Sequence, residues 1–249
     1  MRSFKQIQRT GCVSAWLFVF ATLVGATSAT AVDPADEIEA RVRQIYFEGY
    51  PTTASGPLES VAVERLGEML RDPTEEPYWS NIVLALGASE NPRAYRHLAD
   101  FAALQPSGDV SSAVYQARVS LPVALGYLAH SYPTALGMIE KMARDAPLEP
   151  GWRFQSLAGA SLAGALRRSA ITGIAVSGRP EAAIVLTDLE AGTGQRAAAR
   201  AGAAADRSDE LRQHLEFARK LHERAMLDGP ASVLRRGSVS RSAQGRVAP

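Results

Sequence analysis

The sequence predicts an all-α fold in which antiparallel helix hairpins stack side by side. Glycine and proline divide the chain into helix-length segments, and no sustained alternation of polar and apolar residues indicates strands. One short pattern, a helix end followed by a turn and a proline, occurs three times, in residues 85–94, 124–135 and 171–182. Its prolines, Pro92, Pro133 and Pro180, lie 41 and 47 residues apart, a period typical of stacked helix pairs.

The first 31 residues differ in character from the rest of the chain. Three basic residues precede an apolar run over residues 13–26, and Ala29-Thr30-Ala31 fits the small-x-small pattern of a cleavage site. As a helix, this run of 14 residues extends roughly 21 Å, short of the roughly 30 Å of a bilayer core. We therefore expect a secretory signal peptide over residues 1–31, cleaved after Ala31. The alternative is an uncleaved N-terminal membrane anchor.

Composition narrows the chemistry of the mature chain, residues 32–249. Cys12 is the only cysteine and lies in the leader, so disulfides, thiolate metal sites and thiol nucleophiles are not expected. The chain has 27 basic and 26 acidic residues, and the leader holds three of the basic ones, which leaves a net charge of about −2. Such a balance gives no indication of nucleic-acid binding.

Two helices are expected in the N-terminal region, residues 32–75. Asp33-Pro34 is a start signal for the first, which carries Ile38 and Val42 at helical spacing. The second ends at Asp72-Pro73. Its predicted apolar face consists of Leu58, Val61, Val63, Leu66, Met69 and Leu70.

Residues 76–192 contain the three repeated patterns, each predicted as a helix pair. The second helix of each pair begins near its proline, where the first turn of a helix tolerates that residue. Pro122 is expected to kink the long helix before Pro133. Gly159 and Gly164 are predicted to let two helices approach closely. In the second helices, the side chains expected to be buried include Tyr95, Leu98, Phe101, Ala102, Leu104, Leu136, Ile139, Ile184, Val185, Leu186 and Leu189.

Residues 193–230 form a C-terminal helical segment. Ser208 is the predicted N-cap of an amphipathic helix that runs through Leu227 and ends before Gly229-Pro230. Its predicted apolar side consists of Leu211, Leu215, Ala218, Leu221 and Met226. Residues 231–249 have four arginines and no acidic residue, which predicts a basic, disordered tail. The tail is either a solvated end or a contact for anionic lipid or sugar.

The third repeat resembles a HEAT-type repeat. Arg167-Arg168-Ser169-Ala170-Ile171 matches the family's Arg-x-x-Ala-hydrophobic run, and Pro180-Glu181-Ala182 matches its Pro-x-Ala. The second copy lacks the basic residue and inserts a proline, and the first shortens the turn. The resemblance covers roughly residues 76–191. It implies an α-solenoid of stacked hairpins, with a concave face that members of the family commonly use to bind proteins.

No residue is expected to act in catalysis or to bind a metal or cofactor. His97 and Asp100 are predicted to form a solvent-facing polar pair. His214 and His222 are eight residues apart and can share a helix face, but no third zinc ligand lies at a fixed spacing. The serine in Gly159-Ala160-Ser161-Leu162-Ala163 lacks the preceding strand of a nucleophile elbow, so close helix packing is the preferred interpretation.

The sequence therefore favours an exported, non-enzymatic scaffold or adaptor that binds a protein partner. The predicted contact residues lie on the ridge of turns and second helices: Arg93, Arg96, Tyr132 and Arg179. Tyr132 and Trp152 are either packing residues or aromatic anchors of such a face. One alternative is an envelope hydrolase that gathers His97 or His130 with a carboxylate. Another is a structural envelope protein, held at the membrane by an uncleaved leader.

Overall fold

The computed structural model describes residues 33–44, 46, 50–51, 57–145, 150–198 and 204–230. Only the backbone is described for residues 193–198 and 204–208. The chain divides into two units, Met1–Ala31 and Val32–Pro249, and every described residue belongs to the second. The predicted signal peptide and the predicted basic tail therefore lie outside the described residues.

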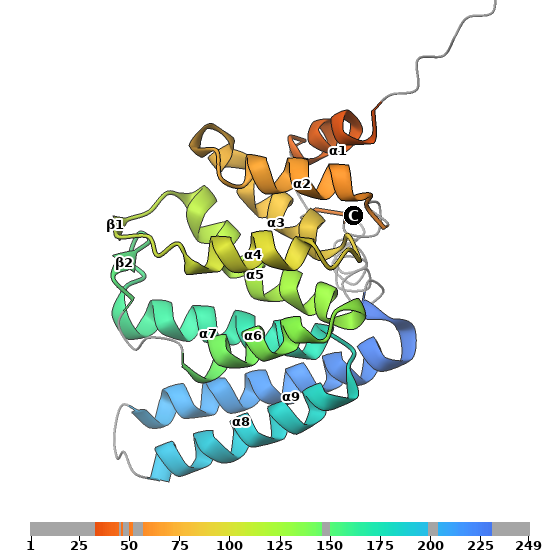
Figure 1. The fold of residues 1–249 in the computed structure, drawn as a ribbon. Coiled ribbons are helices and arrows are strands. Elements are labelled where there is room, and N and C mark those ends of the chain that lie inside the picture. Colours follow the sequence, from red (N-terminus) through yellow and green to blue (C-terminus); the bar gives the residue numbers. More distant parts are fainter. Residues whose placement is uncertain are drawn as a thin grey trace, which may run out of the picture. The chain divides into compact units, whose positions relative to one another are not determined.

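The described part of the chain is mostly helical, so the predicted all-α class is confirmed (Figure 1). Its α-helices are α1 (Pro34–Val42), α2 (Ser60–Met69), α3 (Trp79–Gly87), α4 (Ala94–Ala103), α5 (Ser112–Ser131), α6 (Thr134–Arg144), α7 (Gly159–Val176), α8 (Pro180–Ala198) and α9 (Ala204–Asp228). A 3₁₀ helix over Pro73–Tyr78 joins α2 to α3. In the described ranges, no helix combines the length and the apolar character that crossing a membrane requires.

Two very short strands lie outside the helices. β1 (Gly108–Asp109) and β2 (Trp152–Arg153) pair in parallel, with Gly108 opposite Trp152 and Asp109 opposite Arg153. The side chains of Asp109 and Arg153 form an exposed ion pair, with 2.9 Å between Nη2 and Oδ2. Sequence periodicity could not reveal these strands, because two residues are too few to show alternation.

The helix ends follow the expected local chemistry. The Asp33 carboxylate accepts a hydrogen bond from the Ala35 N–H at 2.9 Å, and Pro180 opens α8. A serine lies two or three residues before the proline of each of the three repeated patterns. The hydroxyls of Ser89, Ser131 and Ser177 each donate to the carbonyl three residues earlier, at 2.6, 3.2 and 2.7 Å. The end of the first helix nevertheless differs in the second copy: Ser89 and Ser177 lie just beyond α3 and α7, whereas Ser131 is the last residue of α5.

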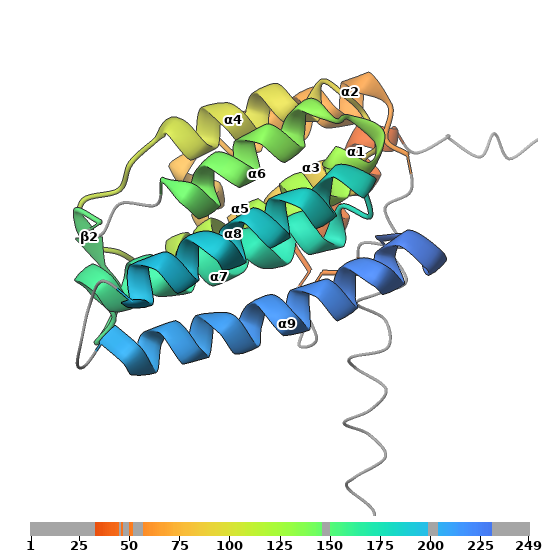
Figure 2. The ribbon, with the colours of Figure 1, turned by 90° about the horizontal axis from the view of Figure 1, so that it is seen from below.

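Helices α3 to α8 form two rows (Figures 1 and 2). α3, α5 and α7 pack against one another in succession, and α9 packs on both α7 and α8. α4, α6 and α8 lie on one side of this row, each packed on the helix that precedes it in the chain. The core lies between the rows, where Leu86, Leu98, Leu125, Ile139 and Ile171 are fully buried.

The glycines of the three repeated patterns lie where the row helices cross. A Cβ atom added at Gly173 would lie 2.6 Å from the carbonyl carbon of Pro122, and one at Gly126 would clash with the Gly173 carbonyl oxygen. One added at Gly87 would lie 2.7 Å from the carbonyl carbon of Ala124. Such separations are too short for a side chain, so the helix backbones touch directly. α3, α5 and α7 are thus in contact through backbone atoms.

The predicted close approach at Gly159 and Gly164 is wrong. A Cβ atom at Gly159 would meet nothing within 4 Å, and one at Gly164 would meet only the Arg168 side chain at 3.5 Å. Both glycines lie near the start of α7, away from its crossing with α5 at Gly173. Ser161 lies in the same turn of α7 and is exposed.

Four side chains predicted as buried are exposed. Val61, Leu104, Ile184 and Met226 expose 64%, 59%, 65% and 47% of their surface. Leu104 is the C-cap of α4, beyond the last helical turn. The other three lie beside the buried stripe of their helix. In α8, for example, the stripe is Ala182, Val185, Leu186 and Leu189.

The start of the C-terminal helix also differs from the prediction. α9 begins at Ala204, four residues before the predicted N-cap Ser208. Alanine has the highest intrinsic helix propensity, which favours extension of the helix through Ala204 and Ala205. Met226 is exposed because the stripe facing the core is Leu215, Ala218, Leu221, His222 and Ala225.

Substitution of Gly173 tests the backbone contact. Gly173→Ala should lower the free energy of unfolding by about 3 kcal/mol, the upper range for overpacking, because its methyl group collides with backbone that cannot rotate away. Gly137→Ala in α6 is the matched control. No atom lies within 4 Å of its added Cβ, so the helix should gain roughly 0.5–1 kcal/mol. Urea denaturation of both variants measures the difference, and equal stability of the two would contradict this contact.

Candidate functional site

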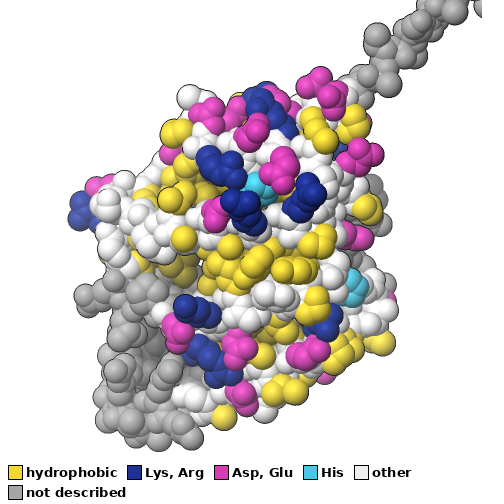
Figure 3. Space-filling view, in the orientation of Figure 1, with side chains coloured by type: hydrophobic (Ala, Val, Ile, Leu, Met, Phe, Trp, Pro, Cys, Tyr) yellow, Lys and Arg dark blue, Asp and Glu magenta, His cyan; other side chains and the backbone are white. Residues whose placement is uncertain are grey.

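An apolar groove runs between α4 and α6, and Figure 3 shows it as a strip of hydrophobic side chains. Its walls are Ala99, Ala102 and Ala103 from α4 and Met138 and Met142 from α6. Both helices pack extensively on helices of the other row and much less on each other. The α4–α6 groove therefore exposes side chains that a closer pair of helices would bury.

The groove deepens into a cavity where α4 ends. The cavity has a volume of about 400 Å³ and continues beneath the groove to α5, α7 and the segment around β2. Besides the groove walls, it is lined by the apolar residues Pro106, Leu121, Pro122, Pro150, Trp152 and Leu166, and by Gln105, Arg118, Lys141 and Asp145. Most of this surface is apolar, as in small-molecule sites.

Arg118 is the most constrained charge of the cavity. Its Nη1 donates to the Phe101 carbonyl at 2.9 Å, and its Nη2 donates to the carbonyl of Leu104. These bonds satisfy carbonyls at the C-terminal end of α4, where a helix favours positive charge. The guanidinium also lies over the Phe101 ring, 4.4 Å from its centroid. Arg118 thus fixes the end of α4 on α5.

The charge of Arg118 has no counter-ion among the described residues. No carboxylate there forms an ion pair with it, and its buried Nε has no hydrogen-bond partner. Burial removes water from the guanidinium and lowers the pKa of Arg118 to about 10, so it remains charged at neutral pH. One feature of the sequence could have indicated this site: apart from His130, Arg118 is the single acidic or basic residue in α5. Sequence reasoning did not select it.

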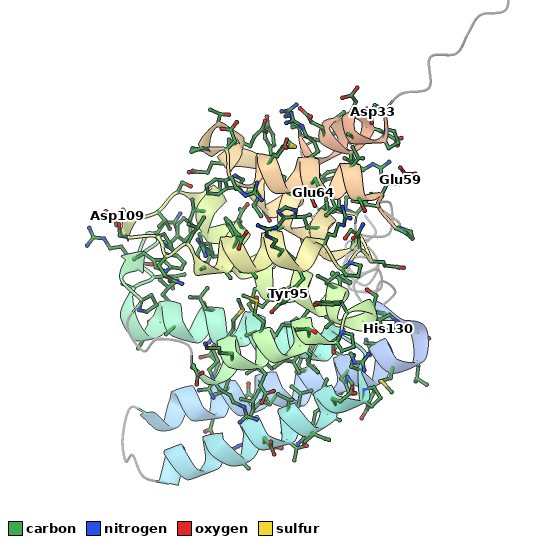
Figure 4. The ribbon with its side chains drawn as sticks, viewed as in Figure 1. Asp33, Glu59, Glu64, Tyr95, Asp109 and His130 are labelled. Carbon is green, nitrogen blue, oxygen red and sulfur yellow. The ribbon has the colours of Figure 1, made fainter. Side chains whose placement is uncertain are left out.

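Tyr132, one of the predicted contact residues, lies between the end of α5 and the start of α6. It caps α5, and its ring packs on that of Tyr95, with 5.3 Å between the centroids. Figure 4 shows Tyr95 between α4 and α6. The side chain of Tyr132 is half-buried. It is therefore partly a packing residue and partly available to a ligand.

The predicted arginines occupy two different places. Arg93 and Arg96 are exposed at the start of α4, on the helix that carries Tyr95. Arg179 lies at the turn before α8, where its Nε and Nη2 each donate to a Glu181 oxygen at 3.1 Å. This pairing lowers the pKa of the Glu181 carboxyl. Among the described residues, no hydrogen bond or ion pair joins any two of the four predicted side chains.

His97 is buried, so the predicted solvent-facing pair with Asp100 is wrong. Only 4% of its surface is exposed, because it faces α2 and packs against Gly67. Its Nδ1 lies 2.9 Å from Nη2 of Arg71, and its Nε2 lies 3.1 Å from Glu64 (labelled in Figure 4). Arginine can only donate, so Nδ1 accepts and Nε2–H donates to the carboxylate. Both nitrogens are occupied in linking α2 to α4.

The other histidines make backbone contacts between helices. His130 Nδ1 lies 3.2 Å from the Ser177 carbonyl oxygen. On α9, His214 Nε2 lies 2.9 Å from the Arg168 carbonyl oxygen, and His222 has a hydrogen bond to the backbone of Ala175. His214 and His222 do share a helix face, and that face docks on α7. In the described ranges, no three His, Cys, Asp or Glu residues are grouped so that they could hold a metal ion.

Trp152 is buried, with 5% of its surface exposed, so it is not an anchor on an exposed face. It lies on β2 and lines the cavity instead. The sequence position of Trp152 near a turn did not indicate whether its side chain is buried, because its burial depends on β1 and on the helices around the cavity.

Comparison of the chain with protein-family models, with curated proteins and with solved structures gave no match. The described residues define a mostly helical protein with an apolar groove and a cavity lined by an arginine that has no counter-ion there.

The histidines of α9 predict a pH-dependent stability. Burial lowers the pKa of His214 and of His222 below the usual 6.5, since the apolar surroundings disfavour the charged rings. As the pH falls below 6.5, the unfolded chain therefore binds protons first, and the free energy of unfolding decreases until the folded rings protonate as well. Above that pH this contribution is fully present.

Urea denaturation at about pH 7 and about pH 5 measures this loss. A variant with His214→Gln and His222→Gln should lose less stability than the wild type over the same interval. The carboxyls whose pKa is lowered, Glu39, Asp72, Asp109 and Glu181, begin to contribute at about pH 5, but the wild type and the double variant share them, so their contribution cancels in the comparison. If the double variant lost as much stability as the wild type over this interval, the loss would not come from His214 and His222.

Proposed function

We propose that residues 76–192 form a HEAT-like solenoid. The succession of α3, α5 and α7 in one row, with α4, α6 and α8 in the other, supports this proposal. The recurrence of one serine and one glycine contact in each copy of the pattern supports it further. Each hairpin has an apolar face that its neighbours cover, as repeat architectures require. α9 would then cover the last hairpin.

We propose that the protein is an exported, non-enzymatic scaffold or adaptor that binds a protein partner through the α4–α6 groove. The observation that carries this proposal is the strip of partly exposed alanine and methionine side chains between the two helices. Contiguous apolar surface of this kind is typical of interaction sites, and methionine adapts readily to different partners. Tyr95 and Tyr132 extend the same surface with aromatic area.

Charge beside the groove indicates the kind of partner. Arg93 and Arg96 project from the start of α4 and are exposed. The partner should therefore present apolar side chains to the groove and acidic side chains to these arginines. Complementary charges of this kind accelerate association and select partners.

Export rests on the predicted signal peptide over residues 1–31. Sequencing the N-terminus of the protein from its native host distinguishes the two forms of the leader. A chain that begins at Val32 is free after export, whereas one that retains residues 1–31 is anchored.

Charge reversal on α4 tests the site. A tagged protein carrying Arg93→Glu and Arg96→Glu should lose a cross-linked, stoichiometric partner that the wild type retains, because acidic residues of the partner would be repelled. Both residues are exposed, so the free energy of unfolding should change by less than about 0.5 kcal/mol. Cross-linking in the native host, followed by purification and mass spectrometry, measures the partner.

The matched control carries Lys220→Glu and Arg224→Glu, two exposed residues of α9. It has the same change in net charge but leaves the groove intact, so it should retain the partner. Retention of the partner by the α4 variant as well would contradict the proposed site. Loss in both variants would show that overall charge, and not the groove, controls the interaction.

A further inference from the structure

We propose that the cavity at the end of the α4–α6 groove binds a small molecule that carries a carboxylate on an apolar chain. The cavity shares Ala99, Ala102, Ala103, Met138 and Met142 with the α4–α6 groove, but binding of the small molecule does not depend on a protein partner there. The combination that supports it is an apolar cavity, a partly buried arginine without a counter-ion, and a lysine that lines the same space.

The apolar part of the ligand would occupy the floor and walls. Leu121 and Trp152 are buried there, and Met138, Met142 and Leu166 are half-buried, so they are shielded from water on one side only. The volume of about 400 Å³ lies in the range of roughly 300–1,000 Å³ that small-molecule sites occupy. Methionine side chains are flexible, which lets the walls adjust to a chain of methylene groups.

The charged part of the ligand would meet Arg118. A guanidinium has five N–H donors. Nη1 donates to the carbonyls of Phe101 and Ala102, at 2.9 and 3.4 Å, and one hydrogen of Nη2 is directed to Leu104. Nε has no partner among the described residues, but it is fully buried, so a ligand in the cavity cannot reach it. The bond from Nη2 to Leu104 lies at an exposed site, so the second hydrogen of Nη2 is the donor that Arg118 offers to one further acceptor.

A carboxylate is the group that best matches this site. Among the residues that line the cavity, Arg118 and Lys141 are positive and Asp145 is negative, which leaves one net positive charge. A monoanion neutralises it, whereas a cation would be repelled. Hydrogen bonds between a guanidinium and a carboxylate are roughly twice as strong as neutral ones, and the low polarity of the cavity strengthens them further. A neutral chain would leave Arg118 without a counter-ion.

Binding of three probes that share a ten-carbon chain tests the proposal. Isothermal titration of residues 32–249 with decanoate, decanol and decyltrimethylammonium compares a negative, a neutral and a positive head group. Decanoate should bind at one site per chain, and at least about tenfold more tightly than the other two, a factor that corresponds to roughly 1.4 kcal/mol. Equal affinity for decanoate and decanol, or no saturable binding of decanoate, would overturn the proposal.

Two substitutions place the ligand in the cavity. Ala103→Trp fills the space from an exposed position, so the fold should be retained while decanoate affinity falls at least about tenfold. Lys141→Gln should weaken decanoate about threefold, and Lys220→Gln, an exposed lysine change on α9, should leave it unchanged. Unaltered binding in Ala103→Trp would show that decanoate binds elsewhere.

Arg118→Gln tests the recognition of charge directly. In this variant decanoate and decanol should bind with equal affinity, because the net positive charge of the cavity is lost. Arg118 also holds the end of α4, so circular dichroism must first show that the variant is folded. If it is unfolded, the comparison of head groups in the wild type and in Ala103→Trp decides the proposal.

Discussion

The backbone contact between α5 and α7, at Gly126 and Gly173, sets the spacing of the helices on which the other features depend. At that crossing neither helix has room for a side chain, and α3 meets α5 in the same way at Gly87. One row of helices is therefore as close as backbone atoms allow. In the other row, α4 and α6 carry alanine and methionine side chains on their facing sides and lie farther apart. The α4–α6 groove follows from this difference in spacing.

Polar side chains hold neighbouring helices together. Arg118 of α5 binds the final carbonyls of α4, and His97 of α4 lies between Glu64 and Arg71. His214 and His222 fix α9 on α7. Because buried polar groups are costly without partners, these bonds also select one register for each helix pair. Arg118 Nε and His222 Nδ1 have no hydrogen-bond partner among the described residues, and Arg118 also has no counter-ion there. The charge of Arg118 is where we place a ligand.

The sequence predicted the helices well and their faces less well. Prolines and glycines are local signals, so the starts of α1, α6 and α8 could be predicted to within about two residues. Helical spacing alone does not decide which of two residues beside each other on the helix surface faces the core. This explains why Val61 and Ile184, predicted as buried, are exposed. The all-helical class required no more than these patterns.

The candidate site could be predicted only in part. The predicted Arg93, Arg96 and Tyr132 lie on α4 or beside it, although no finding tests their role. Arg118 and the burial of His97 depend on contacts between residues 14 to 33 positions apart, which no local pattern reveals. Close approach was expected at Gly159 and Gly164 but is absent there. A pair of small residues shows that two helices can approach closely at that place, but not that they do.

A double-mutant cycle at the helix crossings tests the central claim most directly. Gly126→Ala and Gly173→Ala both push α5 away from α7, so the double variant should lose clearly less free energy of unfolding than the two single losses together. Gly87→Ala pushes α5 from its opposite side, so its combination with Gly173→Ala should lose at least as much as the two single losses. Urea denaturation in a stabilising osmolyte keeps all variants measurable. Additive losses for Gly126→Ala and Gly173→Ala would show that the two glycines do not share one contact, and would contradict this account of the fold.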